Sequence, residues 1–144
     1  MRGYFTLKNS KIEIYVDGGS RGNPGPSGVG VVILDANGKR LKEVSKYIGE
    51  ATNNIAEYNA LLYGLEEALM LRVDEIVVNL DSELVAKQLT GDYRVKDSIL
   101  KPLFERAMNM LNSFKGFEIR HIEREKNKEA DKLVNRAINL ASLI

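Results

Sequence analysis

The stretch that decides the fold runs from Lys11 to Pro26 and reads KIEIYVDGGSRGNPGP. Its first part, Lys11–Asp17, alternates apolar and polar residues, which is typical of a β-strand with one apolar face. The second part is dense in glycine and proline and predicts a turn. The sequence therefore places a carboxylate, Asp17, where a strand ends and a glycine-rich turn begins.

Two more strands follow this turn. Gly28–Leu34 reads as a buried strand, and the pair Asn37-Gly38 is a strong hairpin signal. The chain then returns along Lys39–Ile48. These three strands predict an antiparallel meander.

The remainder of the chain alternates between helices and strands. Apolar residues recur at helical spacing from Ile55 to Leu69, and Asn53 or Asn54 is the expected N-cap. Further elements are expected at Ser82–Leu89 (helix), Ser98–Phe114 (helix), Asn127–Leu143 (helix capped by Asn127), Glu75–Leu80 (strand) and Phe117–Ile122 (strand). Because strands joined by helices pair in parallel, we expect an α/β fold with a mixed five-stranded sheet, three antiparallel strands then two parallel, flanked by helices.

The composition bounds the class of protein. A chain of 144 residues fits one domain, with residues 1–10 as a short tail or an extra strand. A net charge of +1 excludes a strongly basic DNA-coating protein, and zero cysteines exclude disulfides, thiolate zinc sites and cysteine nucleophiles. No apolar run approaches the roughly 20 residues that span a bilayer. We therefore expect a soluble, cytoplasmic monomer with no membrane contact and no obligate protein partner.

Four carboxylates are placed to meet at one edge of this sheet. Asp17 and Asp81 end strands that the topology makes neighbours, and ligands bind at such strand ends in open α/β sheets. Glu57 and Asp131 lie near the starts of two helices and could face the same edge. Carboxylates without His or Cys partners favour Mg²⁺ or Mn²⁺ over zinc. Each could also be structural, as a turn-forming aspartate or an acid favoured by a helix dipole.

Four separated motifs occur in order: DGGSRGNPGP at 17–26, TNNIAE at 52–57, DS at 81–82 and NKEAD at 127–131. Together they resemble type 1 ribonuclease H (ribonuclease HI), in a form without the basic protrusion, over nearly the whole chain. The resemblance implies a ribonuclease H-like fold and endonucleolytic hydrolysis of the RNA strand of RNA–DNA hybrids, leaving 5′-phosphate and 3′-hydroxyl ends. It also implies two Mg²⁺ ions, with Mn²⁺ as a substitute.

The same resemblance implies roles for individual residues. Asp17 would bridge both metals, Glu57 and Asp81 would hold the nucleophile-side ion, and Asp131 would complete the second. The expected hybrid contacts are Ser20, Asn23, Asn53 and Asn54 in the minor groove and Thr52 at a DNA phosphate. Asn53 and Asn54 could instead serve mainly as helix caps.

The residue that assists proton transfer or product release stays open between His121 and the following loop. His121, the only histidine, stands ten residues before Asp131, the spacing of a mobile-loop histidine in the family. It also falls in a predicted strand, so Arg124 or Lys126 could take its place. An imidazole can shuttle protons near neutral pH, whereas an arginine only stabilises charge.

Two departures from the family pattern bear on the substrate. Residues 91–97 replace the basic protrusion directly, leaving Arg94, Lys96 and Lys101 as substitutes, and Glu50 stands where several members carry an arginine. The alternatives are a broader ribonuclease that also cuts duplex RNA and a non-catalytic hybrid-binding domain. A DNA-junction resolvase would call for a dimer. The glycine-rich turn and the paired asparagines argue against it.

Overall fold

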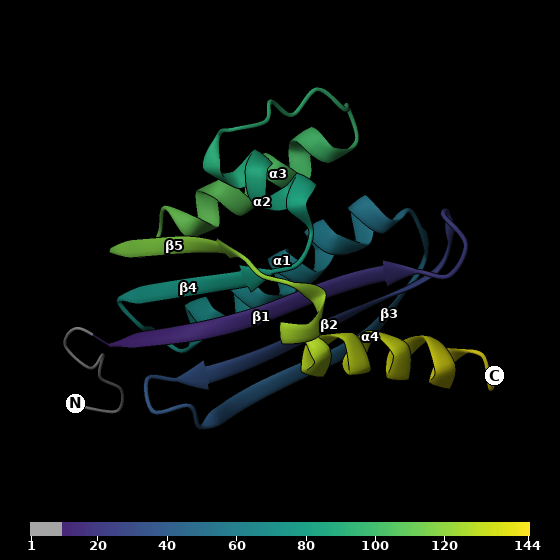
Figure 1. Cartoon of the computed structure of the whole chain (residues 1–144), viewed down its shortest axis with the longest axis horizontal. Coiled ribbons are helices and arrows are strands. Elements are labelled where there is room, and N and C mark those ends of the chain that lie inside the picture. The colour runs from purple at the N-terminus through teal and green to yellow at the C-terminus, as the bar shows by residue number, and fades with distance from the viewer. Residues whose placement is uncertain (1–9) are drawn as a thin grey trace.

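The computed structural model describes residues 10–144 (Figure 1). This part of the chain is built around a single mixed β-sheet. Its strands are β1 (Lys11–Ser20), β2 (Gly25–Asp35), β3 (Arg40–Ala51), β4 (Glu75–Leu80) and β5 (Gly116–His121), in the order β3-β2-β1-β4-β5. The central strand β1 pairs antiparallel with β2 and parallel with β4. The predicted fold class is confirmed. The predicted tail lies outside the described residues, except for Ser10.

Helices cover both faces of the sheet. They are α1 (Asn53–Met70), α2 (Glu83–Thr90), α3 (Leu100–Leu111) and α4 (Lys128–Ala141), with a 3₁₀ turn η1 (Arg124–Lys126) before α4. Figure 1 shows α1 behind the sheet, with α2 and α3 on the same side, and α4 in front of β2 and β3. Within residues 10–144, no helix has both the length and the apolar character needed to cross a membrane.

Three local predictions were wrong. The glycine-rich segment is not all turn: pairing of Ser20 with Ser27 continues β1 and β2 into it. The N-cap of α1 is Thr52, whose hydroxyl accepts the N–H of Ile55 at 3.2 Å, one residue before the expected asparagines. Helix α3 begins at Leu100 rather than Ser98, because the Asp97 carboxylate accepts the first free N–H groups of the helix.

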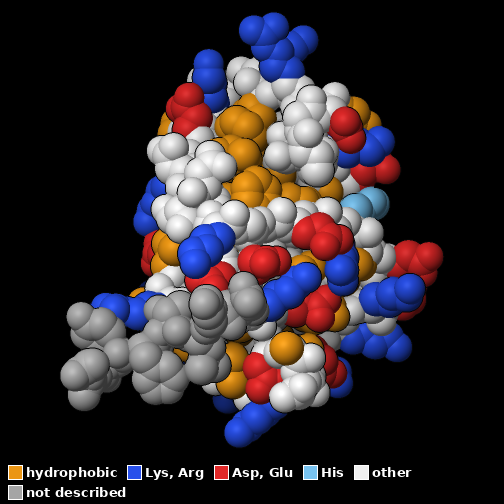
Figure 2. Space-filling model, turned by 90° about the vertical axis from the view of Figure 1, so that its left-hand side faces the viewer, with side chains coloured by type: hydrophobic (Ala, Val, Ile, Leu, Met, Phe, Trp, Pro, Cys, Tyr) orange, Lys and Arg blue, Asp and Glu red, His pale blue; other side chains and the backbone are white. Residues whose placement is uncertain are grey.

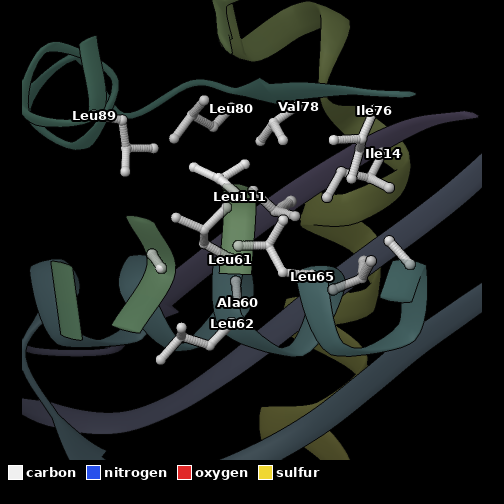
Figure 3. Close-up of a cluster of buried hydrophobic side chains, with 14 of the residues drawn as sticks. Ile14, Ala60, Leu61, Leu62, Leu65, Ile76, Val78, Leu80, Leu89 and Leu111 are labelled. Atoms are coloured by element: carbon white, nitrogen blue, oxygen red, sulfur yellow. The ribbon is translucent and has the colours of Figure 1, made fainter. Parts of the chain in front are cut away.

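The main core lies between the sheet and α1. Ile14 of β1 and Leu61 and Leu65 of α1 are fully buried and point toward one another (Figure 3). Burying a leucine or isoleucine side chain stabilises the fold by roughly 2 kcal/mol relative to its exposed state. This apolar layer fixes α1 against the central strands, and with it every residue that α1 carries to the sheet edge.

On the opposite face, glycines let the backbone of α4 lie directly against β2. A Cβ atom at Gly30 would stand 2.1 Å from the carbonyl oxygen of Ala130, and one at Gly28 would stand 2.9 Å from that of Val134. No real side chain fits at such separations. The absence of side chains on this stripe of β2 therefore sets the position of α4 and of Asp131 in its first turn.

We predict that Gly30→Ala destabilises the protein by about 2–3 kcal/mol, because the new methyl group overpacks against α4. A fall in Tm of roughly 5–10 °C would be expected for a chain of this size. The measurement is thermal unfolding followed by circular dichroism.

Gly116→Ala is the matched control for this substitution. A Cβ at Gly116 would meet only the Glu75 side chain, at an ordinary 3.6 Å. Its free energy of unfolding should change by less than about 1 kcal/mol. Equal Tm values for the two variants would contradict the tight α4–β2 contact.

Candidate active site

Three carboxylates converge where β1 and β4 end. Asp17 and Asp81 directly follow Val16 and Leu80, which face each other in the parallel register of these strands. Glu57 comes from the second turn of α1. Carboxylate oxygens of Asp17, Glu57 and Asp81 lie within 4.8 Å of one another. The structure therefore brings three of the four predicted carboxylates together.

Glycine at position 18 makes the approach of α1 to β1 feasible. A Cβ there would stand 2.1 Å from the carbonyl oxygen of Ala56. The Gly18 N–H instead donates a short hydrogen bond to the Glu57 carboxylate. The glycine thus brings α1 close and orients Glu57 toward the strand end.

The electrostatics of this cluster are unfavourable when no cation is bound. Burial, together with the charges of Glu57 and Asp81, raises the pKa of Asp17 well above its usual range. Burial raises the pKa of Glu57 to about 7, although the hydrogen bond from Gly18 partly opposes this. The neighbouring Glu57 carboxylate adds to the rise in the pKa of Asp17. Like charges that cannot all ionise are relieved by a bound cation.

The cluster opens onto a cleft of about 420 Å³. Asp131 lines this cleft from α4 but lies outside the tight group of three carboxylates. The polar lining includes Ser20, Arg21, Asn53, Asn54, Ser82, Arg124 and Asn135. A set of carboxylate oxygens without sulfur or imidazole suits a hard divalent cation such as Mg²⁺ or Mn²⁺.

Neutral donors hold three of the four carboxylates in place. Glu57 accepts from the backbone of Gly18, Asp81 from the Asn127 amide at 3.0 Å, and Asp131 from the Asn135 amide at 3.4 Å. Among residues 10–144, no lysine or arginine lies within salt-bridge distance of any of the four. An amide orients a carboxylate without cancelling its charge, so the charge stays available for a cation.

Comparison with known proteins places this arrangement in a family. The sequence model of the family described as reverse transcriptase-like matches residues 15–137. The chain is 42% identical over 132 residues to ribonuclease HI of Halobacterium salinarum, covering 92% of this chain and 66% of that one. It superposes on LC11-RNase H1, solved in complex with an RNA/DNA hybrid, with a TM-score of 0.86 and 48% identity, covering 90% of this chain and 98% of that one. The chain belongs to the type 1 ribonuclease H family.

Other relatives are longer than this chain. The bifunctional protein Rv2228c of Mycobacterium tuberculosis is 41% identical over 133 residues, which cover 92% of this chain and 36% of that protein. The chain thus spans about two thirds of the Halobacterium relative and about a third of the mycobacterial one.

The predicted substrate contacts of this ribonuclease H domain divide between two hollows. Ser20, Asn53 and Asn54 line the carboxylate cleft. Asn23 and Thr52 line a separate cavity of about 290 Å³, which Asn54 also borders. Several of these polar groups bond within the chain. The side-chain Oδ1 of Asn53 accepts the backbone N–H of Ser20 at 2.9 Å, and the side-chain Oδ1 of Asn23 accepts the backbone N–H of Asn53 at 3.0 Å.

The three candidates for the assisting residue are separated by the fold, and Lys126 borders a different hollow from the carboxylate cleft. Arg124 lies in η1, lines the cleft, and its charge acts on Glu57. His121 is the last residue of β5, paired with Leu80, and its side chain is exposed. His121 is not one of the described residues that line the cleft.

Sequence reasoning missed two residues that orient carboxylates in this ribonuclease H site. Asn127 is the N-cap residue of α4, as predicted, but its side chain makes no cap hydrogen bond. The buried Asn127 amide donates instead to the carbonyl oxygen of Val16 and to Asp81. Asn135 had no predicted role. Its partner Asp131 lies four residues earlier on the same helix, a spacing that could have indicated the contact.

We predict that Asp17→Asn stabilises the metal-free protein above neutral pH. An acid with a raised folded-state pKa costs stability as pH rises from its unfolded value, near 4, through the folded value. For Glu57 this loss extends to about pH 7, and for Asp17 it extends further. The asparagine amide stays neutral over this whole pH range, so it avoids this loss.

The measurement is Tm in EDTA at pH 4, 6 and 8. We expect equal values at pH 4 and a Tm a few degrees higher for Asp17→Asn at pH 8, at about 3 °C per kcal/mol. Asp92→Asn, at an exposed position, is the matched control and should show no such divergence. A difference in Tm between Asp17→Asn and wild type that does not change with pH would contradict the electrostatic cause.

Proposed function

We propose that this protein is a metal-dependent endoribonuclease that hydrolyses the RNA strand of RNA–DNA hybrids. The observation that carries the proposal is the convergence of Asp17, Glu57 and Asp81 within 4.8 Å, at a cleft that Asp131 also lines. LC11-RNase H1, 48% identical, has been solved with an RNA/DNA hybrid. The protein would act as a monomer in the cytoplasm.

The reaction adds water across one phosphodiester bond. Water attacks phosphorus, the bond from phosphorus to the 3′ oxygen breaks, and the products carry a 5′-phosphate and a 3′-hydroxyl. Asp17, Glu57 and Asp81 would hold one divalent cation, and Asp17 with Asp131 a second. When bound, two such ions make the attacking water more acidic and stabilise the leaving oxygen.

The chain's own residues would fix the geometry of this reaction. Gly18 and Asn127 hold Glu57 and Asp81 through hydrogen bonds, so their carboxylates need little reorientation when a cation binds. Asn53 and Asn54 border the cleft and offer donors and acceptors to the 2′-hydroxyl that distinguishes RNA from DNA.

Arg124, rather than His121, would be the cationic side chain that acts on the substrate. Arg124 lines the cleft, while His121 lies at the exposed end of β5. A guanidinium stabilises negative charge on a phosphate through several parallel donors but does not shuttle a proton. Arg124 would therefore stabilise developing charge, and water would carry the protons.

Acidic residues near the expected contact with the DNA strand favour a broader substrate range. Thr52, the expected contact of the DNA phosphate, lines a cavity that the acidic Asp97 also lines. A second acidic residue, Glu50, lies two positions before Thr52 in the sequence and is exposed. Figure 2 shows a basic cluster at the top of one face, at the height of the α2–α3 segment in Figure 1, above a mixture of acidic and basic side chains. Within the α2–α3 segment, Arg94 and Lys96 lie between the two helices and Lys101 lies in the first turn of α3. A weak phosphate pocket would reduce discrimination between DNA and RNA partners, so duplex RNA is the second candidate substrate.

The test is cleavage of four labelled nucleic acids: hybrid, duplex RNA, single-stranded RNA and duplex DNA. With Mg²⁺ or Mn²⁺ we expect internal cuts in the RNA strand of the hybrid, and no cuts in EDTA. Asp17→Asn should lower the rate at least about 100-fold, and Asp92→Asn should leave it unchanged. Cleavage of duplex RNA at a rate near that of the hybrid would establish the broader activity. Hybrid binding without cleavage would indicate a binding domain.

The assisting residue is tested by Arg124→Ala and His121→Ala. We expect Arg124→Ala to lower kcat by about 10- to 100-fold, because a cation beside the reacting phosphate is lost, and His121→Ala to change it less than about twofold. Lys126→Ala is the matched control, since Lys126 lies in the same 3₁₀ turn but borders a different hollow. A larger loss for His121→Ala would reverse the assignment.

A further inference from the structure

A hydrogen-bonded bridge connects the glycine-rich turn to the fourth carboxylate. Arg21 donates from Nη2 to the side-chain oxygen of Asn135 at 3.1 Å. Asn135 in turn donates from Nδ2 to the Asp131 backbone carbonyl at 3.0 Å and to the Asp131 carboxylate at 3.4 Å. The bridge joins residues 114 positions apart in the sequence and spans one wall of the cleft.

Asp131 is the carboxylate that depends most on such a bridge. The other three lie within 4.8 Å of one another and are fixed by strand ends and by α1. Asp131 lies apart from them on α4, and the Asn135 amide is the donor that reaches its carboxylate. Rotation of the Asp131 side chain is therefore limited by Asn135, which Arg21 holds from the other side.

Most N–H donors of the Arg21 guanidinium, and its positive charge, are available to bind a ligand. No carboxylate lies within 4.0 Å of it in the described part of the chain, and one of its five N–H groups is accounted for by Asn135. Its side chain is exposed at the cleft. An arginine with free, parallel donors is suited to bidentate binding of a phosphate.

The backbone around Arg21 is held firmly. The Arg21 N–H donates to the Pro26 carbonyl at 2.9 Å. Gly25 packs so closely that a Cβ there would stand 1.9 Å from the Arg21 carbonyl oxygen. A side chain on such a fixed backbone, and itself anchored by Asn135, loses little freedom when it binds a ligand.

We propose that Arg21 and Asn135 act as a unit: Asn135 positions Asp131 for the second cation, and Arg21 binds a phosphate of the nucleic acid on the α4 side of the cleft. This inference rests on the proposed function and deepens it. It assigns substrate contacts to two cationic side chains that line the same cleft as the carboxylates, Arg21 in the glycine-rich turn and Arg124 in η1. Arg21 would contact substrate, whereas Asn135 would be a positioning residue.

The Arg21 contact is tested by hybrid binding without catalysis. Fluorescence anisotropy of a labelled hybrid in EDTA, over a range of NaCl concentrations, gives the affinity and its salt dependence. We expect Arg21→Gln to weaken binding about 3- to 10-fold and to reduce the slope of log K against log salt by about 1. Arg106→Gln is the matched control: it removes the same charge from α3, where Arg106 pairs with Glu66, and should change affinity less than about twofold.

The positioning role of Asn135 is tested with Mn²⁺ alone, by calorimetric titration. We expect Asn135→Ala to weaken binding at the second site about 10-fold, as loss of an outer hydrogen bond to a ligand does. Asn139→Ala, one turn further along the exposed side of α4, is the matched control and should bind Mn²⁺ as wild type does. Tm values within about 2 °C of wild type would show that both variants fold.

The coupling of the two residues is tested by the double variant. If Asn135 holds Arg21, then Arg21→Gln should weaken hybrid binding less in the Asn135→Ala background than in wild type. Unchanged affinity and slope for Arg21→Gln, unchanged Mn²⁺ binding for Asn135→Ala, or strictly additive effects would each overturn the proposed unit. Neither assay requires cleavage, so an inactive wild-type enzyme would overturn the proposed function while these outcomes still decide the bridge. A wild-type protein that binds no hybrid would overturn both.

Discussion

Repulsion among buried carboxylates is the constraint on which the rest of this structure depends. The parallel pairing of β1 with β4 brings Asp17 and Asp81 to one sheet edge, and α1 adds Glu57 within 4.8 Å. Burial and the nearby negative charges both disfavour the ionised forms of Asp17 and Glu57. The apolar layer between α1 and the sheet must therefore offset a local cost, because it holds Glu57 of α1 beside the strand ends that carry Asp17 and Asp81.

The protein handles this charge with neutral donors instead of cations. A backbone N–H and two asparagine amides orient Glu57, Asp81 and Asp131. A lysine or arginine in the same places would stabilise the metal-free fold but would compete with a divalent ion. The arginines of the cleft, Arg21 and Arg124, lie beyond salt-bridge distance of the carboxylates, where a nucleic acid could use them.

Local patterns in the sequence were sufficient for the architecture but not for the details of the site. Alternation in Lys11–Asp17 and helical spacing from Ile55 onward depend on neighbouring residues, so these elements were predicted correctly. Asn127 is the predicted N-cap of α4, but the role of its side chain was missed because the partners, Val16 and Asp81, are 111 and 46 positions away. The cap of α1 fell to Thr52 because Asn53 is engaged by the distant Ser20. Such choices depend on tertiary contacts that no sequence window contains.

The central place of β1 has a consequence for how the molecule opens. Asp17 pairs with Gly30 on one side, and its neighbour Val16 pairs with Leu80 on the other, while β3 and β5 form the edges (Figure 1). Fraying begins at edges and termini, and strands hydrogen-bonded on both sides exchange their amide protons only in the largest openings. Partial unfolding that releases β3 or β5 would leave Asp17 in its ladder. The reactive centre is thus built into the last cooperative unit of the sheet to come apart.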